Sequence, residues 1–171
     1  MTLKLAFVGL CLGAAALAAP AFAQDPPAAA PSTAPAPPAP PYGRLVTLAE
    51  AKRVVEVAQA EAVRNGWTMV FTVVEPNGAV VLTQKMDGAQ YGALDVALGK
   101  AVTAARFRRP TKTMADGVKA GNLNPIFTNA TAIDGGELLI VKGEIIGALG
   151  VSGALAAMDG QVARVGAAAL N

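Results

Sequence analysis

The sequence predicts a single α+β domain in which helices pack on one antiparallel sheet. Two pairs of short, β-branched segments are each joined by a tight turn, which is typical of hairpins. Helical stretches separate and flank the two hairpins, and this order favours one antiparallel sheet with helices packed against it. The chain has 171 residues, enough for one domain of ordinary size.

The first 41 residues are expected to lie outside this domain. Residues 1–23 are typical of a secretory signal peptide: Lys4 precedes an uncharged apolar core, and Ala21-Phe22-Ala23 forms a small-residue cleavage site. Residues 24–41 are rich in proline and alanine, which predicts a disordered, semi-extended linker. We therefore expect an exported protein, periplasmic or secreted, without stable membrane insertion after cleavage, whose domain spans residues 42–171.

The first half of the domain is predicted to contain one helix and one hairpin. Thr47 and Glu50 form a capping box, and apolar residues at helical spacing follow as far as Asn65-Gly66. A strand over residues 68–74 should turn at Glu75-Pro76-Asn77-Gly78, because proline and glycine suit a tight turn. The strand that returns should cover residues 79–85.

The second half is predicted to add two helices, a second hairpin and a final helix. The first of these elements is an alanine-rich helical pattern, followed by a second helical segment that starts after a proline. A loop with glycine and proline breakers, a hairpin about Lys142-Gly143 and a last helical stretch come next. The expected bounds are helices 91–107 and 111–119, a loop at 120–128, strands 137–141 and 144–151, and a helix from about 155 or 158 to 170.

Composition excludes several classes of chemistry. The chain has no histidine, and its one cysteine, Cys11, lies in the expected signal peptide. Histidine-dependent nucleophile systems, His/Cys zinc sites and a histidine haem ligand are therefore excluded. The formal net charge is +2, so no strong positive field indicates a nucleic-acid partner.

Glycines at 147, 150 and 153 do not form a nucleotide loop. Their spacing is G-x-x-G-x-x-G after a hairpin, whereas a dinucleotide fingerprint needs G-x-G-x-x-G in a βαβ unit. Glycines inside a strand more often mark close approach of a neighbouring backbone or ligand. Ser152-Gly153 leads toward a helix N-terminus, which can hold a carboxylate.

Lys100 is the first candidate for ligand binding. It lies in an almost uncharged helical stretch and shares one face with Thr103 and Phe107. If that face lines a cleft, Lys100 can bind a carboxylate. The spacing alone favours a snorkelling or ion-paired lysine at the helix surface.

A second group of candidates joins the first hairpin to the long helix. Asp87 suits a helix cap or a turn, and Met86 and Tyr91 suit core or rim packing. Both Met86 and Tyr91 also carry atoms that can ligate haem iron. The arginines that end this helix can meet haem propionates, although a solvated helix end is the ordinary explanation: Arg106, Arg108 and Arg109.

Several motifs follow one another in a fixed order over residues 45–170. They are Glu75-Pro76-Asn77-Gly78, Met86-Asp87-Gly88-Ala89, Lys100-Ala101-Val102-Thr103-Ala104, Arg106-Phe107-Arg108-Arg109-Pro110-Thr111, Asp134-Gly135-Gly136, the hairpin through Gly143, Gly147 to Gly153, and Asp159. This order and spacing resemble the GlcG/HbpS family, also called the haem-degrading domain family. The departures are Glu75 in place of a common Asp, Glu137-Leu138 in place of a frequent small-Pro pair, and the missing histidine.

The resemblance implies a three-layer domain with about five antiparallel strands between helices. It also implies homo-oligomers and exported members that bind haem. In this chain the iron ligand would be Met86, Tyr91, Thr103, Lys100 or none. The first hypothesis is thus an exported protein that binds haem or another tetrapyrrole.

Two alternatives stay open at the level of sequence. One is an enzyme acting on haem, or on a small carboxylate held between Lys100, Thr103 and Ser152-Gly153. The other is a ligand-free sensory or structural oligomer that docks a partner protein, a role that the proline-rich linker fits equally well.

Overall fold

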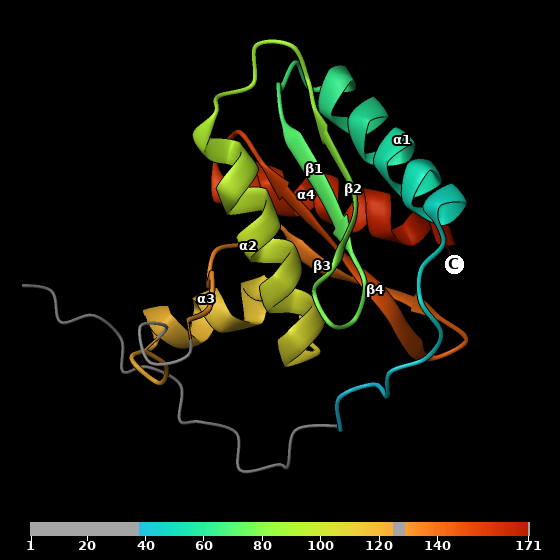
Figure 1. The fold of residues 1–171 in the computed structure, drawn as a ribbon. Coiled ribbons are helices and arrows are strands. Elements are labelled where there is room, and N and C mark those ends of the chain that lie inside the picture. Colours follow the sequence, from blue (N-terminus) through green and yellow to red (C-terminus); the bar gives the residue numbers. More distant parts are fainter. Residues whose placement is uncertain (1–37, 125–128, 171) are drawn as a thin grey trace, which may run out of the picture. The chain divides into compact units, whose positions relative to one another are not determined.

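The computed structural model describes residues 38–124 and 129–170, and these contain two pairs of consecutive strands separated and flanked by four α-helices (Figure 1). The elements are α1 (Leu48–Arg64), β1 (Val70–Val74), β2 (Val80–Lys85), α2 (Gly92–Phe107), α3 (Thr111–Lys119), β3 (Gly136–Val141), β4 (Glu144–Ser152), α4 (Ala156–Ala167) and the 3-10 turn η2 (Ala168–Leu170). The expected signal peptide, most of the expected linker and residues 125–128 of the expected loop lie outside the described residues.

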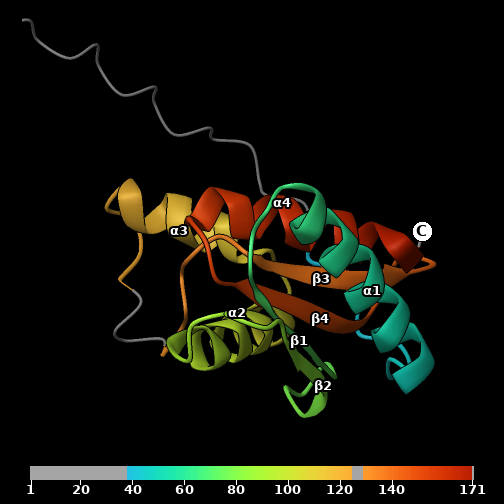
Figure 2. The same ribbon diagram turned by 90° about the horizontal axis from the view of Figure 1, so that it is seen from above.

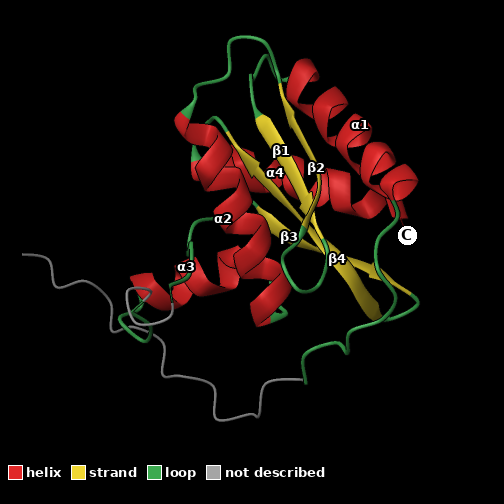
Figure 3. Cartoon of the chain, in the orientation of Figure 1, coloured by secondary structure: helices red, strands yellow, loops and turns green. Residues whose placement is uncertain are grey.

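The strands form one antiparallel sheet in the order β2-β1-β4-β3 (Figure 3). We expected about five strands, and the described ranges contain four. The segment before α1 adds only a single parallel bridge, between Tyr42 and Ile145. β4 is longer than β1, and its pairing with β1 ends at Ala148. Tyr42 pairs with the part of β4 that continues past this point, on the same side as β1.

Helices cover both faces of the sheet (Figure 2). On one face, α1 and α4 pack with the sheet in a core that includes Val54, Phe71, Leu149 and Val162. On the other face, the alanines of α2 pack against β1, β3 and β4. Gly150 permits this close approach, because a Cβ at that position would lie 2.7 Å from the backbone nitrogen of Ala101.

The capping box at the start of α1 is confirmed. The Thr47 hydroxyl accepts from the Glu50 N–H at 3.2 Å, and the Glu50 carboxylate accepts from the Thr47 N–H at 2.9 Å. Arg44 pairs with the same carboxylate and, together with the Thr47 N–H, lowers the pKa of Glu50 to about 2.

The two predicted hairpins are confirmed as β1–β2 and β3–β4. Lys142 and Gly143 both have positive φ, as a two-residue turn matched to the twist of the strands requires. Of the two roles expected for Asp87, the turn is confirmed and the helix cap is not: Asp87 lies in a turn, and α2 begins only at Gly92. Within the described residues, no helix is long and apolar enough to cross a membrane.

Candidate functional site

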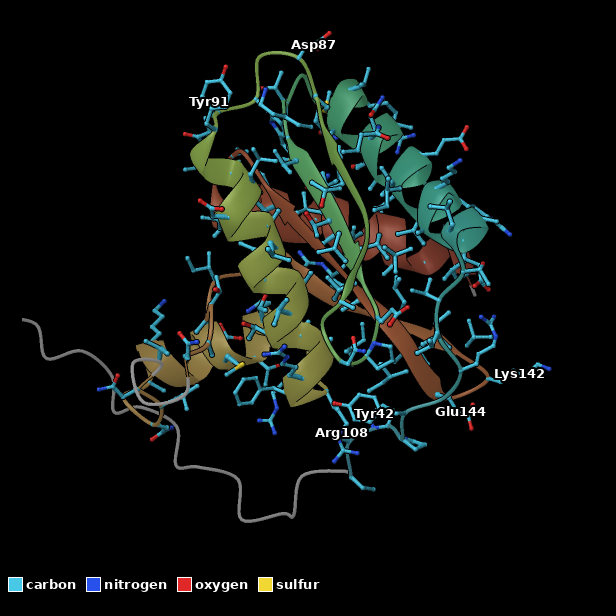
Figure 4. All side chains as sticks on the ribbon, in the orientation of Figure 1. Tyr42, Asp87, Tyr91, Arg108, Lys142 and Glu144 are labelled. Carbon is cyan, nitrogen blue, oxygen red and sulfur yellow. The ribbon has the colours of Figure 1, made fainter. Side chains whose placement is uncertain are left out.

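Five of the eight predicted site residues lie at one end of the sheet. Val70, the first residue of β1, pairs with Lys85 on one side and with Ser152 on the other. The chain leaves β2 into Met86, Asp87 and Tyr91, and it leaves β4 through Ser152 into Gly153. Figure 4 shows Asp87 and Tyr91 at this end. We call Met86, Asp87, Tyr91, Ser152 and Gly153 the sheet-end cluster.

Tyr91 presents its phenol to solvent. The residue is 84% exposed, and no described residue hydrogen-bonds to its hydroxyl. The Lys85 ammonium lies 5.3 Å from the centre of the ring, close enough for a cation–π contact. Tyr91 is therefore a free phenol with a positive charge beside it.

Met86 is less available than Tyr91. Its sulfur lies 3.4 Å from the backbone nitrogen of Met69 and accepts that N–H, and its own backbone N–H donates to the Met69 carbonyl at 3.0 Å. The Met86 side chain also packs against the core between the sheet and α1. Ligation of iron by this sulfur would require breaking its contact with Met69.

Ser152 and Gly153 form the link from β4 to α4. Gly153 has φ +148° and lies against the segment just before β1, where an added Cβ would be 2.8 Å from the Met69 Cα. A carboxylate from the first turn of α4 (Ala156–Ala167) bonds back to this link, ahead of the helix itself. The Asp159 carboxylate accepts the Ala154 N–H at 3.0 Å.

Lys100 lies buried behind this link. Its ammonium donates to the Asp159 carboxylate at 2.7 Å and to the Val151 carbonyl at 2.9 Å. The prediction of an ion-paired lysine is confirmed, but its expected surface position is wrong, because Lys100 is 0% exposed. Because the ammonium already pairs with Asp159, Lys100 is not available to bind a small carboxylate ligand.

Glycines make room for the ion pair. Lys100 comes from α2 and Asp159 from α4, on opposite faces of the sheet, and they meet where β3 begins. At Gly135 an added Cβ would lie 2.9 Å from the Lys100 nitrogen and 2.7 Å from the Val151 oxygen. Burial raises the pKa of Asp159, and the hydrogen bond from Lys100 opposes that rise.

Thr103 and Phe107 lie farther along α2 and do not join the sheet-end cluster. The Thr103 hydroxyl is buried and accepts the Thr131 N–H at 2.9 Å. Phe107 lies partly exposed in the last turn of the helix. Of the predicted helix face, Thr103 packs against the segment around Thr131, and Lys100 lies beside Gly135 and Gly136 at the start of β3.

Sequence reasoning missed a charged group on β3. Glu137 lies 3.6 Å from Arg164, which also contacts Asp134 at 3.2 Å. Burial raises the pKa of Glu137 to about 7, although the charge of Arg164 opposes this. No spacing rule joins β3 to α4, so only the fold reveals this group. Among the described residues, no cluster of three or more His, Cys, Asp or Glu side chains can hold a metal ion.

Residues 46–168 match the family model described as haem-degrading protein, HbpS-like. A 15.0 kDa protein of Citrobacter freundii, from the dhaT–dhaS intergenic region, is 36% identical over 119 residues, which cover 67% of this chain and 84% of that protein. GlcG of Escherichia coli K12 is 37% identical over 105 residues, covering 60% and 77%. A double mutant of Streptomyces reticuli HbpS superposes with a TM-score of 0.69 at 31% identity, covering 85% and 99%.

Proposed function

The chain belongs to the HbpS-like family of haem-degrading proteins, and we propose that it is an exported protein that binds haem or a related tetrapyrrole and assembles into homo-oligomers. The family match, which spans nearly all of the sheet and its helices, carries the proposal of haem as ligand. The sheet-end cluster is the proposed site, because Tyr91 exposes its phenol there and the Lys85 ammonium lies over its ring.

Tyr91 is the residue that best fits haem iron in a chain without histidine. The other side chains considered as ligands are engaged: Met86 with the Met69 N–H, Lys100 with Asp159, and Thr103 with the Thr131 N–H. Tyrosine oxygen is an established haem ligand in proteins. Bound haem would bring the iron and its redox chemistry, and Tyr91 would hold it.

Other residues at this end of the sheet suit the rest of a tetrapyrrole. The Lys85 ammonium, which contacts the Tyr91 ring and donates to the Met86 carbonyl at 3.4 Å, would be the cation for a propionate. Leu155, at the start of α4, is 70% exposed and offers apolar surface for a macrocycle. The buried Lys100–Asp159 pair keeps the link between β4 and α4 in place.

Export and assembly are separate parts of this proposal. The pattern of residues 1–23 supports export, and Gln24 would then be the first residue of the mature chain. The family match supports the proposed assembly into homo-oligomers. N-terminal sequencing of the protein recovered from outside the cytoplasm tests export, and light scattering after size-exclusion chromatography tests assembly.

A haemin titration followed by absorbance tests the ligand. We expect a Soret band that saturates at about one haem per chain and co-elutes with the protein. Tyr91→Phe removes the phenol oxygen and should shift the band and weaken binding. Tyr42→Phe is the matched control, because Tyr42 lies at the other end of the sheet, and it should behave like the parent.

Two outcomes would count against this proposal. A featureless spectrum that grows without saturation would remove haem as the ligand. A parent-like band in Tyr91→Phe would remove Tyr91 as the iron ligand, and Met86→Leu would then be the next variant to titrate.

A further inference from the structure

A hollow lies at the end of the sheet opposite Tyr91. It has a volume of about 410 Å³ and is lined mostly by carbon atoms of the segment before α1, the β1–β2 turn and the last turn of α2: Tyr42, Gly43, Leu45, Pro76, Asn77 and Arg106. Figure 4 shows Tyr42 and Arg108 together at this end, far from Asp87 and Tyr91. Its volume suits a small organic ligand.

The apolar wall of the hollow is held in place before any ligand arrives. The Tyr42 hydroxyl donates to the Ala105 carbonyl at 3.0 Å, which ties the ring to the end of α2. The Arg108 guanidinium lies 5.6 Å from the centre of that ring. Gly43 donates to the Ile145 carbonyl at 2.9 Å, so the segment before α1 is anchored to β4. Tyr42 is nevertheless 46% exposed and Leu45 54%.

Arg106 gives the hollow a positioned cation. Its Nε donates to the Asn77 carbonyl at 3.0 Å, which fixes the guanidinium against the β1–β2 turn. No described residue accepts from its two terminal nitrogens, and no described carboxylate forms an ion pair with it. These two nitrogens are therefore free to bind a carboxylate with paired hydrogen bonds.

The described carboxylates near the hollow form no ion pair with Arg106. Glu75, next to Pro76, accepts from the Asn77 side-chain amide at 3.5 Å. Glu144 lies next to Gly43, but it lines an adjoining hollow together with two cations, Arg44 and Lys142. Lys142 and Glu144 point outward from the β3–β4 turn in Figure 4. Arg108, above the Tyr42 ring, adds a second positive charge on the side of α2.

We propose that this hollow binds a small, mostly apolar monocarboxylate, with its carboxylate on Arg106 and its body against Tyr42, Leu45 and Pro76. An aromatic body fits best, because the Tyr42 ring offers a fixed face for stacking. This site is separate from the sheet-end cluster, so it does not depend on haem binding.

Titration with 2-naphthoate, a fluorescent aromatic carboxylate, tests the proposal on the purified protein. We expect saturation at one site per chain and chemical-shift changes of the Gly43 and Asn77 amides by NMR. Arg106→Gln should weaken binding roughly tenfold, as expected for loss of a charge-assisted hydrogen bond. The neutral isostere 2-naphthamide should bind weakly to the parent and to the variant alike.

Two further variants complete the experiment. Arg53→Gln is the matched control, because Arg53 is an exposed arginine of α1, and it should bind 2-naphthoate like the parent. Leu45→Asp places a carboxylate in the hollow at an exposed position, so it should fold normally and lose binding. Binding that fails to saturate, or parent-like affinity in Arg106→Gln or Leu45→Asp, would overturn the proposal.

Discussion

Lys100 and Asp159 form an ion pair that joins the two faces of the sheet. The ammonium from α2 and the carboxylate from α4 are 2.7 Å apart, and the two residues are 0% and 2% exposed. Neither charge is stable alone in such a site, because burial removes it from water. The Val151 carbonyl and the Ala154 N–H complete their hydrogen bonds, so the pair also holds the end of β4 against α4.

Removal of the lysine should be costly. Lys100→Met leaves Asp159 buried without its cation, and we expect the free energy of unfolding in urea to fall by about 3–5 kcal/mol. Lys52→Met, an exposed change on α1, is the control and should stay within about 0.5 kcal/mol. Adding Asp159→Leu to Lys100→Met should recover part of the loss. Equal urea midpoints for Lys100→Met and the parent would show that the ion pair does not contribute to stability.

Gly135 should not tolerate a side chain. An added Cβ would lie within 2.9 Å of both Lys100 and Asp159, and φ is +123°, where residues with side chains are strained. We expect Gly135→Ala to lower the melting temperature, at a cost of about 2–4 kcal/mol. Gly92→Ala is the control, because nothing lies near its added Cβ. If Gly135→Ala melted at the same temperature as Gly92→Ala, the close contacts at Gly135 would not limit stability.

Stability should decrease as the pH rises toward 7 because of Glu137. Burial raises the pKa of this carboxyl from 4.5 to about 7, so the folded protein binds more protons than the unfolded chain between these values. Below about pH 4.5 the carboxyl is protonated in both states and does not lower the free energy of unfolding. Above about pH 7 it is charged in both states, and the loss of stability from burying that charge has reached its full size.

Glu137→Gln isolates this effect, because glutamine stays neutral. We expect the variant to equal the parent near pH 4 and to exceed its stability at pH 8 by on the order of 2 kcal/mol. Urea unfolding across this range measures the difference. Asp159, whose pKa burial also raises, contributes in the same direction to both proteins and cancels in the comparison. Parallel pH profiles would show that Glu137 titrates at its ordinary pKa.

The cap of α1 should make a smaller, local contribution. Thr47→Ala removes the hydroxyl that accepts the Glu50 N–H, and we expect a loss of about 1 kcal/mol in the free energy of unfolding. Thr113→Ala, at an exposed position within α3, is the matched control and should cost less. Hydrogen exchange at the first amides of α1 should accelerate only in Thr47→Ala.

Local patterns predicted most of the secondary structure. The capping box, the turn at Glu75–Gly78 and the Lys142-Gly143 turn each depend on residues within four positions of one another, so their physics is visible in the chain itself. The number of strands was less accessible. The expected count came from a family resemblance, and the segment at Tyr42 pairs through one bridge only.

The sequence by itself determined the helices and hairpins of this protein, its lack of histidine chemistry and the family to which it belongs. Only the tertiary structure decided which candidate side chains are free. Tyr91 is exposed, whereas Met86 and Lys100 are engaged by Met69 and Asp159, residues 17 and 59 positions away. Such partners meet because of how strands pair and helices cross the sheet, and no periodicity along the chain encodes those contacts.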